Sequence, residues 1–100
     1  MHDDRTSSTP GISGEILTEE FLKPLGISEY RLAKQIKVSP RRINEIIHGT
    51  RRISADTALR LARAFGTSAG FWINLQTHHD LLIEQDRSGD ALDDIHPLAS

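Results

Sequence analysis

Apolar residues recur at three- and four-residue spacings along most of the chain, which is the period of an amphipathic helix. The pattern predicts a first helix that begins near Ser13 and is ended by Pro24 and Gly26. Four further helices each begin at a serine, whose hydroxyl accepts a backbone N–H: Ser28, Ser39, Ser54 and Ser68. Gly49 and Gly66 end two of them. The last ten residues could add a short strand, but no segment alternates clearly, so the predicted fold class is all-α with five helices.

The chain has the length and composition of a single globular domain, with 100 residues, of which 37% are hydrophobic and 26% charged. Residues 1–11 are polar and lack an apolar period, so we expect them to be disordered. Residues 12–87 hold the five helices, the last of which is predicted to run to about Arg87. Residues 88–100 form an acidic C-terminal tail.

The second and third predicted helices carry the spacing of a helix-turn-helix unit. Its apolar positions are Leu32, Ala33, Ile36, Val38, Ile43 and Ile46. Two helices that cross steeply over a short turn approach closely, so a small side chain is needed at Ala33. The turn position before Val38 is usually glycine because its φ tends to be positive. Lys37 stands there instead, at a cost of about 1 kcal/mol. Ordinary helical hairpins match parts of this spacing, but the whole set favours DNA binding.

The fourth predicted helix is expected to add its apolar residues to the same core. These residues are Ala58, Leu59, Ala62 and Phe65.

If the third helix is a recognition helix, the face opposite Ile43 and Ile46 meets DNA. The candidate base-reading residues on that face and at the start of the helix are Ser39, Arg41, Asn44, Glu45 and His48. Arg41 suits a guanine edge and Asn44 an adenine edge. Glu45 could accept a hydrogen bond from cytosine, or it could orient Arg41 through a salt bridge four residues apart.

Net charge is −2 overall but is unevenly distributed, with −4 over residues 1–30, +7 over residues 31–63 and −5 over residues 64–100. A basic block between acidic ends indicates one surface that meets a polyanion. The candidate phosphate contacts are Tyr30, Arg31, Arg42, Arg51 and Arg52. Each arginine taken alone could instead be an ordinary solvated surface residue.

Several other classes of function find no support in the sequence. There is no cysteine, and the adjacent His78 and His79 point about 100° apart on a helix, so no metal site or cofactor is expected. No catalytic motif or phosphate-binding glycine loop occurs, so we do not expect an enzyme. The longest apolar runs are too short to cross a membrane, and the polar N-terminal residues do not resemble a signal peptide. These features favour a cytoplasmic protein.

The fifth predicted helix carries an apolar stripe about 140° wide, wider than the roughly 100° that a core contact needs. The excess width indicates a homodimer interface formed by Trp72, Leu75, Leu82 and Ile83. His78 and His79 lie on the same stripe, so their protonation would place charge in that contact. The alternative is that the stripe only completes the core of the monomer.

From Gly14 to Leu81 the chain resembles the HigA-type antitoxins of toxin–antitoxin modules, which belong to the lambda-repressor-like (XRE) helix-turn-helix family. The resemblance is carried by residues 14–38 (GEILTEEFLKPLGISEYRLAKQIKV), 41–68 (RRINEIIHGTRRISADTALRLARAFGTS) and 71–76 (FWINLQ). It implies a homodimer that represses its own operator and neutralises a cognate HigB-type ribonuclease toxin, which cleaves mRNA on the ribosome. The chain departs from the family at Lys37 and at His79, where similar proteins often have tyrosine.

Three functions remain open at this point. An autorepressing antitoxin would be encoded beside a small basic ribonuclease. A stand-alone helix-turn-helix transcriptional regulator would bind an operator but have no toxin neighbour. A protein-interaction module with a degenerate DNA face would show no salt-dependent affinity for DNA.

Overall fold

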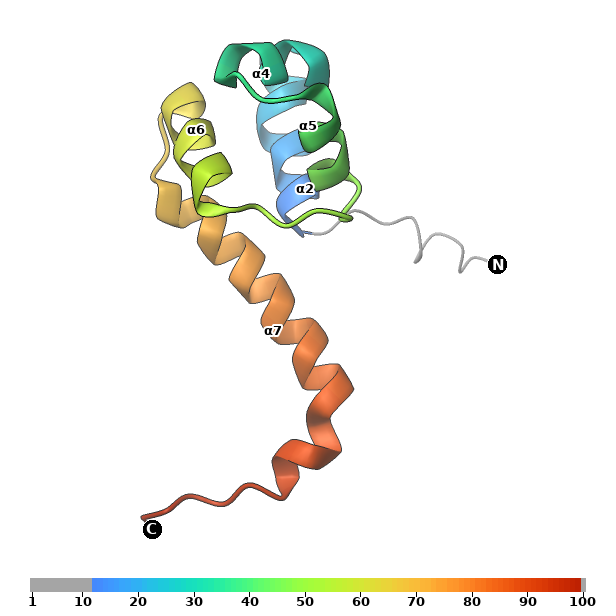
Figure 1. Cartoon of the computed structure of the whole chain (residues 1–100), viewed down its shortest axis with the longest axis vertical. Coiled ribbons are helices and arrows are strands. Elements are labelled where there is room, and N and C mark those ends of the chain that lie inside the picture. The colour runs from blue at the N-terminus through green and yellow to red at the C-terminus, as the bar shows by residue number, and fades with distance from the viewer. Residues whose placement is uncertain (1–11, 100) are drawn as a thin grey trace, which may run out of the picture.

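The computed structural model describes residues 12–99, and in that part of the chain five helical segments form and no strand does (Figure 1). The first segment is continuous and comprises α2 (Ile12–Ile16), the π-helical stretch η1 (Leu17–Leu22) and α3 (Lys23–Leu25). The others are α4 (Glu29–Ile36), α5 (Pro40–Ile47), α6 (Ala55–Phe65) and α7 (Ala69–Asp93). The predicted all-α fold with five helices is confirmed. The prediction for residues 1–11 lies outside the described residues.

Serine side chains begin the four later helices as the sequence predicts. Each hydroxyl oxygen accepts a hydrogen bond from the backbone N–H three residues further on, at 3.0 to 3.2 Å. The four capping residues are Ser28, Ser39, Ser54 and Ser68. At the other end of α6, Gly66 has a φ of 72°, which glycine adopts without steric cost.

Gly26 ends the first helix as predicted, but the prediction that Pro24 helps to stop it is wrong, because Pro24 lies inside the helix. A proline has no N–H to donate, so the carbonyl four residues earlier would lose its partner in a regular α-helix. The backbone before Pro24 instead widens into the π-helical stretch, in which the Lys23 N–H donates to the Thr18 carbonyl. Gly26, with a φ of 67°, then ends the segment.

The turn between α4 and α5 has the conformation expected of a helix-turn-helix unit. Lys37 has a φ of 64° and is the one non-glycine residue with positive φ in the described chain. Its neighbour Val38 donates its N–H to the Ala33 carbonyl at 3.0 Å. Ala33 itself is completely buried, so the small side chain allows α4 and α5 to approach as predicted.

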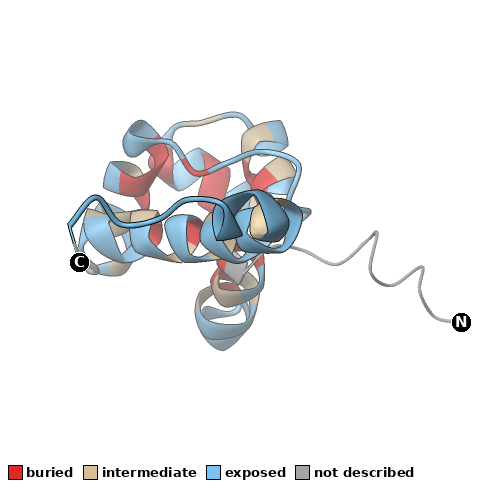
Figure 2. Cartoon of the chain, turned by 90° about the horizontal axis from the view of Figure 1, so that it is seen from below, coloured by how far each residue is buried: buried red, intermediate tan, exposed pale blue. Residues whose placement is uncertain are grey.

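One hydrophobic core lies between the inward faces of the helices, and exposed residues cover the outer surface (Figure 2). Its buried members are Leu17, Leu22, Leu32, Ala33, Ile36, Ile43, Ile46, Ile47, Ile53, Ala58, Leu61 and Trp72. The prediction that Leu59 lies inside is wrong, since this residue is 60% exposed. Helix α6 turns Ala58 and Leu61 inward, and Leu59 lies about 100° around the helix from Ala58, on the solvent side.

Trp72 occupies the centre of this core and has no exposed surface. Its ring lies 4.9 Å from that of Phe71 and 5.2 Å from that of Phe21, measured between centroids. The indole N–H donates to the Thr67 hydroxyl at 2.8 Å, which satisfies its one polar group. The prediction that Trp72 joins a dimer interface is therefore wrong, because the protomer already covers it.

Helix α7 extends from the body of the molecule as a long arm (Figure 1). At 1.5 Å per residue it is about 37 Å long. It ends at Asp93 rather than near Arg87, so the first residues of the predicted acidic tail are helical. Leu81, Leu82 and Ile83 on this arm are each roughly half exposed. Within residues 12–99, no helix is both long enough and apolar enough to cross a membrane.

Gly14 is the point of closest contact between the first helix and α5. A Cβ atom built on Gly14 would lie 2.4 Å from the Ile47 carbonyl oxygen and 2.8 Å from its Cα atom. These are backbone atoms, which cannot move aside cheaply. We predict that Gly14→Ala lowers the free energy of unfolding by about 1–3 kcal/mol, measured by urea titration.

Gly70 provides the matched control, because the nearest atom to its added Cβ would be the Ser68 hydroxyl at 3.9 Å. Gly70→Ala should leave the stability unchanged or raise it slightly, since alanine favours a helix over glycine. Equal stabilities of the two variants would show that α2 and α5 separate at no cost.

Candidate nucleic-acid interface

The starts of α4 and α5 meet at one shallow surface depression, to which both helices contribute polar side chains. Its lining residues are Ser28, Glu29, Tyr30, Pro40, Arg41 and Asn44. Among them, Arg41 exposes 82% of its side chain. The Asn44 amide reaches back to α4 and donates to the Glu29 carboxylate at 3.3 Å. The structure thus brings two of the predicted base-reading residues, Arg41 and Asn44, onto one exposed face with Tyr30 beside them.

Glu45 is held by two arginines rather than left available to a base. Its Oε2 atom accepts a hydrogen bond from Arg41 Nε at 2.9 Å, and its Oε1 atom accepts one from Arg51 Nε at 2.8 Å. The hydrogen bonds from Arg51 and Arg41 lower the pKa of Glu45 below its ordinary value, so the carboxylate stays ionised. Of the two interpretations of Glu45, the salt bridge that orients Arg41 is the one the structure contains.

Ser39 and His48 mark the two ends of α5. The Ser39 hydroxyl oxygen accepts the Arg42 N–H as the helix cap, which fixes it at the entry of the helix. His48 is exposed, and its Nδ1 atom lies 2.8 Å from the Asn44 carbonyl oxygen. A carbonyl oxygen can only accept, so Nδ1 is the donor in this contact.

Arg42 faces α6 rather than solvent, which the sequence did not reveal. Its guanidinium donates to the Asp56 carboxylate at 2.9 Å and to the Thr57 hydroxyl at 3.3 Å. Asp56 also accepts from Arg60 Nε at 3.0 Å. Hydrogen bonds from Arg60 and Arg42 lower the pKa of Asp56 below its ordinary value. Arg42 thus forms an ion-pair link between α5 and α6, and its contact with a phosphate stays a prediction.

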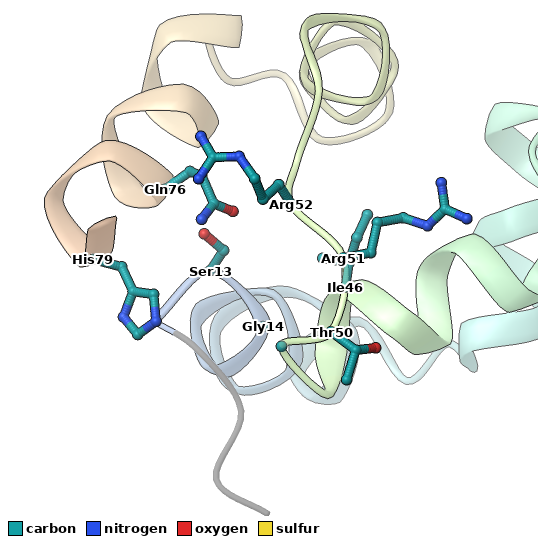
Figure 3. Close-up of a pocket in the computed structure, with 9 residues that line it drawn as sticks. Ser13, Gly14, Ile46, Thr50, Arg51, Arg52, Gln76 and His79 are labelled. Atoms are coloured by element: carbon teal, nitrogen blue, oxygen red, sulfur yellow. The ribbon is translucent and has the colours of Figure 1, made fainter. Parts of the chain in front are cut away.

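The remaining predicted phosphate contacts differ in their surroundings. Tyr30 is 59% exposed, with the Lys34 ammonium 5.6 Å from its ring centroid, and Arg31 is exposed beside it. Arg51 and Arg52 lie in the connection between α5 and α6 and point to opposite sides of it (Figure 3). Arg51 reaches Glu45 of α5, as described above.

Arg52 reaches α7, where it forms an ion pair with Asp80. The hydrogen bond from Arg52 is the main reason that the pKa of Asp80 lies below its ordinary value. Sequence analysis missed Asp80, because no local spacing connects it to Arg52, 28 residues earlier. It also missed Gln76, which accepts a hydrogen bond from the Ile53 N–H, 23 residues earlier.

The steeply crossed pair α4 and α5, with an exposed polar face on α5 and arginines on both sides of it, defines the class of helix-turn-helix DNA-binding proteins. Comparison with known proteins agrees with this class. Residues 19–72 match the family model described as helix-turn-helix.

Two relatives and one solved structure refine this assignment. Virulence-associated protein I of Dichelobacter nodosus is 53% identical over 88 residues, which span 87% of this chain and 80% of that protein. Antitoxin HigA-1 of Vibrio cholerae is 33% identical over 94% of this chain and 89% of its own length. The structure of Pseudomonas aeruginosa antitoxin HigA with the higBA promoter has 44% identity and a TM-score of 0.83, covering 89% of this chain and 98% of that one. The chain therefore belongs to the helix-turn-helix family and, within it, to the HigA-type antitoxins.

The lowered pKa of Asp56 predicts how stability responds to acid. Its ion pairs stabilise the folded state above the unfolded pKa, near 4, and are lost as the pH falls through the lower folded pKa. Asp56→Asn should therefore be less stable than the wild type at pH 7, and the difference should shrink below about pH 4. Urea unfolding of both proteins at pH 7 and at pH 3 measures this difference in stability.

Asp93→Asn serves as the control, since Asp93 makes no ion pair within residues 12–99. A stability difference between Asp56→Asn and the wild type that is the same at pH 7 and pH 3 would contradict this account.

Proposed function

We propose that this protein is an antitoxin that binds its own operator DNA as a dimer and neutralises a cognate HigB-type ribonuclease toxin in the cytoplasm. The observation that carries the DNA-binding part is the exposed face of α5, where Arg41 and Asn44 stand together at the start of the helix. The similarity to Pseudomonas aeruginosa HigA, solved with the higBA promoter, supports the same part. The toxin-neutralising part rests on membership of the antitoxin family.

In this proposal α5 enters the major groove with its first turns against the base edges. Arg41 reads a guanine through its guanidinium, and Glu45 limits the directions in which that guanidinium can point. Asn44 reads an adenine, and Ser39 and His48 contact the DNA at the two ends of the helix. Tyr30, Arg31, Arg51 and Arg52 contact phosphates on either side. The link between Arg42 and Asp56 holds α5 against α6 while this happens.

A dimer supplies the specificity that one short helix lacks, because two copies read half-sites one DNA turn apart, about 34–36 Å. Helix α7 provides the surface for this dimer contact. Phe71, Leu75, His78 and Leu82 follow one another at spacings of four, three and four residues, which places them along one face of the helix. Leu82 is 49% and Ile83 47% exposed, while Leu75 is half-buried against the core. Leu75, Leu82 and Ile83 thus remain the proposed contact, without Trp72.

Arg41→Ala should weaken operator binding by about 1–3 kcal/mol and relax the preference at one base pair, because a bidentate base contact is lost. Fluorescence titration against the operator and its single-base variants measures both effects. Arg87→Ala, which removes an exposed arginine on α7, should leave the affinity within twofold. Binding of Arg41→Ala that equals the wild type at every base would remove Arg41 from the site.

Co-expression tests the antitoxin part. The wild-type protein should restore growth to cells that express the ribonuclease encoded beside it, and the two proteins should co-purify. Arg41→Ala/Asn44→Ala should lose operator binding but still restore growth, because the proposal places DNA and toxin on different surfaces. Operator binding without any rescue by the wild type would favour a stand-alone transcriptional regulator instead.

Leu82→Asp should convert the dimer to a monomer at micromolar concentration, since it places a charge in an apolar contact. Leu59→Asp is the matched control, because Leu59 is a similarly exposed leucine on α6. Sedimentation at neutral pH distinguishes the species. A dimer that survives Leu82→Asp would place the interface elsewhere.

A further inference from the structure

The connection between α5 and α6 is held by two side chains of α7. It carries Arg51 and Arg52, and it ends at Ile53, whose side chain is buried in the core. The Ile53 N–H donates to Gln76 Oε1 at 3.1 Å, and Asp80 forms the ion pair with Arg52. The part of the connection next to α6 is therefore fixed by residues that the DNA-binding helices do not supply.

Gln76 has little freedom to move, because both ends of its amide are used. The residue is 9% exposed, and its Nε2 atom donates to Asp80 Oδ1 at 3.1 Å while its Oε1 atom accepts from Ile53. A buried amide that lost either partner would leave a polar group unsatisfied. The contacts thus run from the Ile53 backbone through Gln76 and Asp80 to the Arg52 guanidinium. Of these residues, Figure 3 shows Gln76 and Arg52.

Packing alone does not fix this connection. A pocket lies beside it, lined by Ser13 of α2, by Thr50 and by His79 of α7 (Figure 3). The Ser13 hydroxyl is buried there without a hydrogen-bond partner among the described residues. Because no described residue fills the space beside the connection, its position depends more on the hydrogen bonds of Gln76 and Asp80.

The position of the connection matters for the DNA-facing side because Arg51 bonds to Glu45, which in turn holds Arg41. A shift of the backbone near Ile53 would move Arg51 and weaken its hold on that carboxylate. The contacts of α7 therefore reach the proposed base-reading arginine through the sequence Ile53, Arg51, Glu45 and Arg41.

We propose that Gln76 and Asp80 are positioning residues for operator binding, which place Arg51 and Arg52 where they meet the phosphates. The inference rests on the proposed DNA-binding function. Asp80 occupies one Nη atom of Arg52, and the guanidinium keeps further N–H donors for a phosphate. The ion pair thus fixes the direction of Arg52 against α7, and the remaining N–H donors stay available for a phosphate on that flank.

The first test is Gln76→Met, which keeps the size of the side chain but removes both hydrogen bonds. We expect operator affinity to fall about tenfold, and the slope of log affinity against log salt to become shallower by about one. In the Arg51→Ala/Arg52→Ala background the same substitution should have no further effect on affinity. Asn74→Met, on the exposed side of the same helix, is the control and should leave the affinity unchanged.

The outcomes separate this proposal from the proposed function. If the wild-type protein shows no salt-dependent operator binding, both fail. Two outcomes would show that the positioning role is wrong while the DNA-binding function stands. In the first, the wild type binds and a folded Gln76→Met variant keeps the wild-type affinity and salt slope. In the second, Gln76→Met lowers the affinity by the same factor in the Arg51→Ala/Arg52→Ala background as in the wild type.

The second test does not depend on the folding of Gln76→Met. Asp80→Asn keeps an acceptor for Gln76 and removes only the charge beside Arg52. The loss of affinity caused by Arg52→Ala should be at least twofold smaller in the Asp80→Asn background than in the wild type, because Arg52 is then no longer oriented. An equal or larger loss in that background would overturn the role of Asp80.

Discussion

The close crossing of α4 over α5 is the constraint on which the DNA-facing surface depends. It requires an alanine at the contact, Ala33, and a backbone at Lys37 that most side chains avoid. Once that turn is made, Ile43 and Ile46 face inward, and the opposite side of α5 therefore faces solvent. The strain at Lys37 is tolerated because the apolar residues on both sides of the turn are buried.

Much of the fold could be predicted because its signals are local. A serine at the start of each of the four later helices and a glycine after a helix act through hydrogen bonds and backbone angles within a few residues. The sequence likewise identified Lys37 and the apolar spacing around it. It misjudged Pro24, because a proline can be accommodated inside a helix when the preceding turn widens, and nothing in the local pattern distinguishes that from a stop.

What the sequence could not provide are the contacts between residues far apart in the chain. Periodicity showed that the stripe on α7 is wide, but only the arrangement of Phe21, Phe65 and Phe71 around Trp72 shows which part of it lies inside. The partners of the charged side chains were likewise not predictable from the sequence. Arg42 and Arg52 look alike in the sequence, yet each pairs with a carboxylate on a different helix. A spacing of three or four residues finds only pairs within one helix, such as Arg41 with Glu45 and Arg60 with Asp56.

The shared carboxylates have a consequence for how the protein would move along DNA. Five of the nine basic residues between positions 31 and 63 are paired, and three carboxylates serve them all: Glu45, Asp56 and Asp80. Pairing reduces the positive potential that attracts the protein to any duplex, while the guanidinium groups keep their fixed directions. A weaker general attraction means a shorter stay on each wrong site. Because its own carboxylates pair with these arginines, we expect the domain to bind DNA of random sequence less strongly and to leave it sooner.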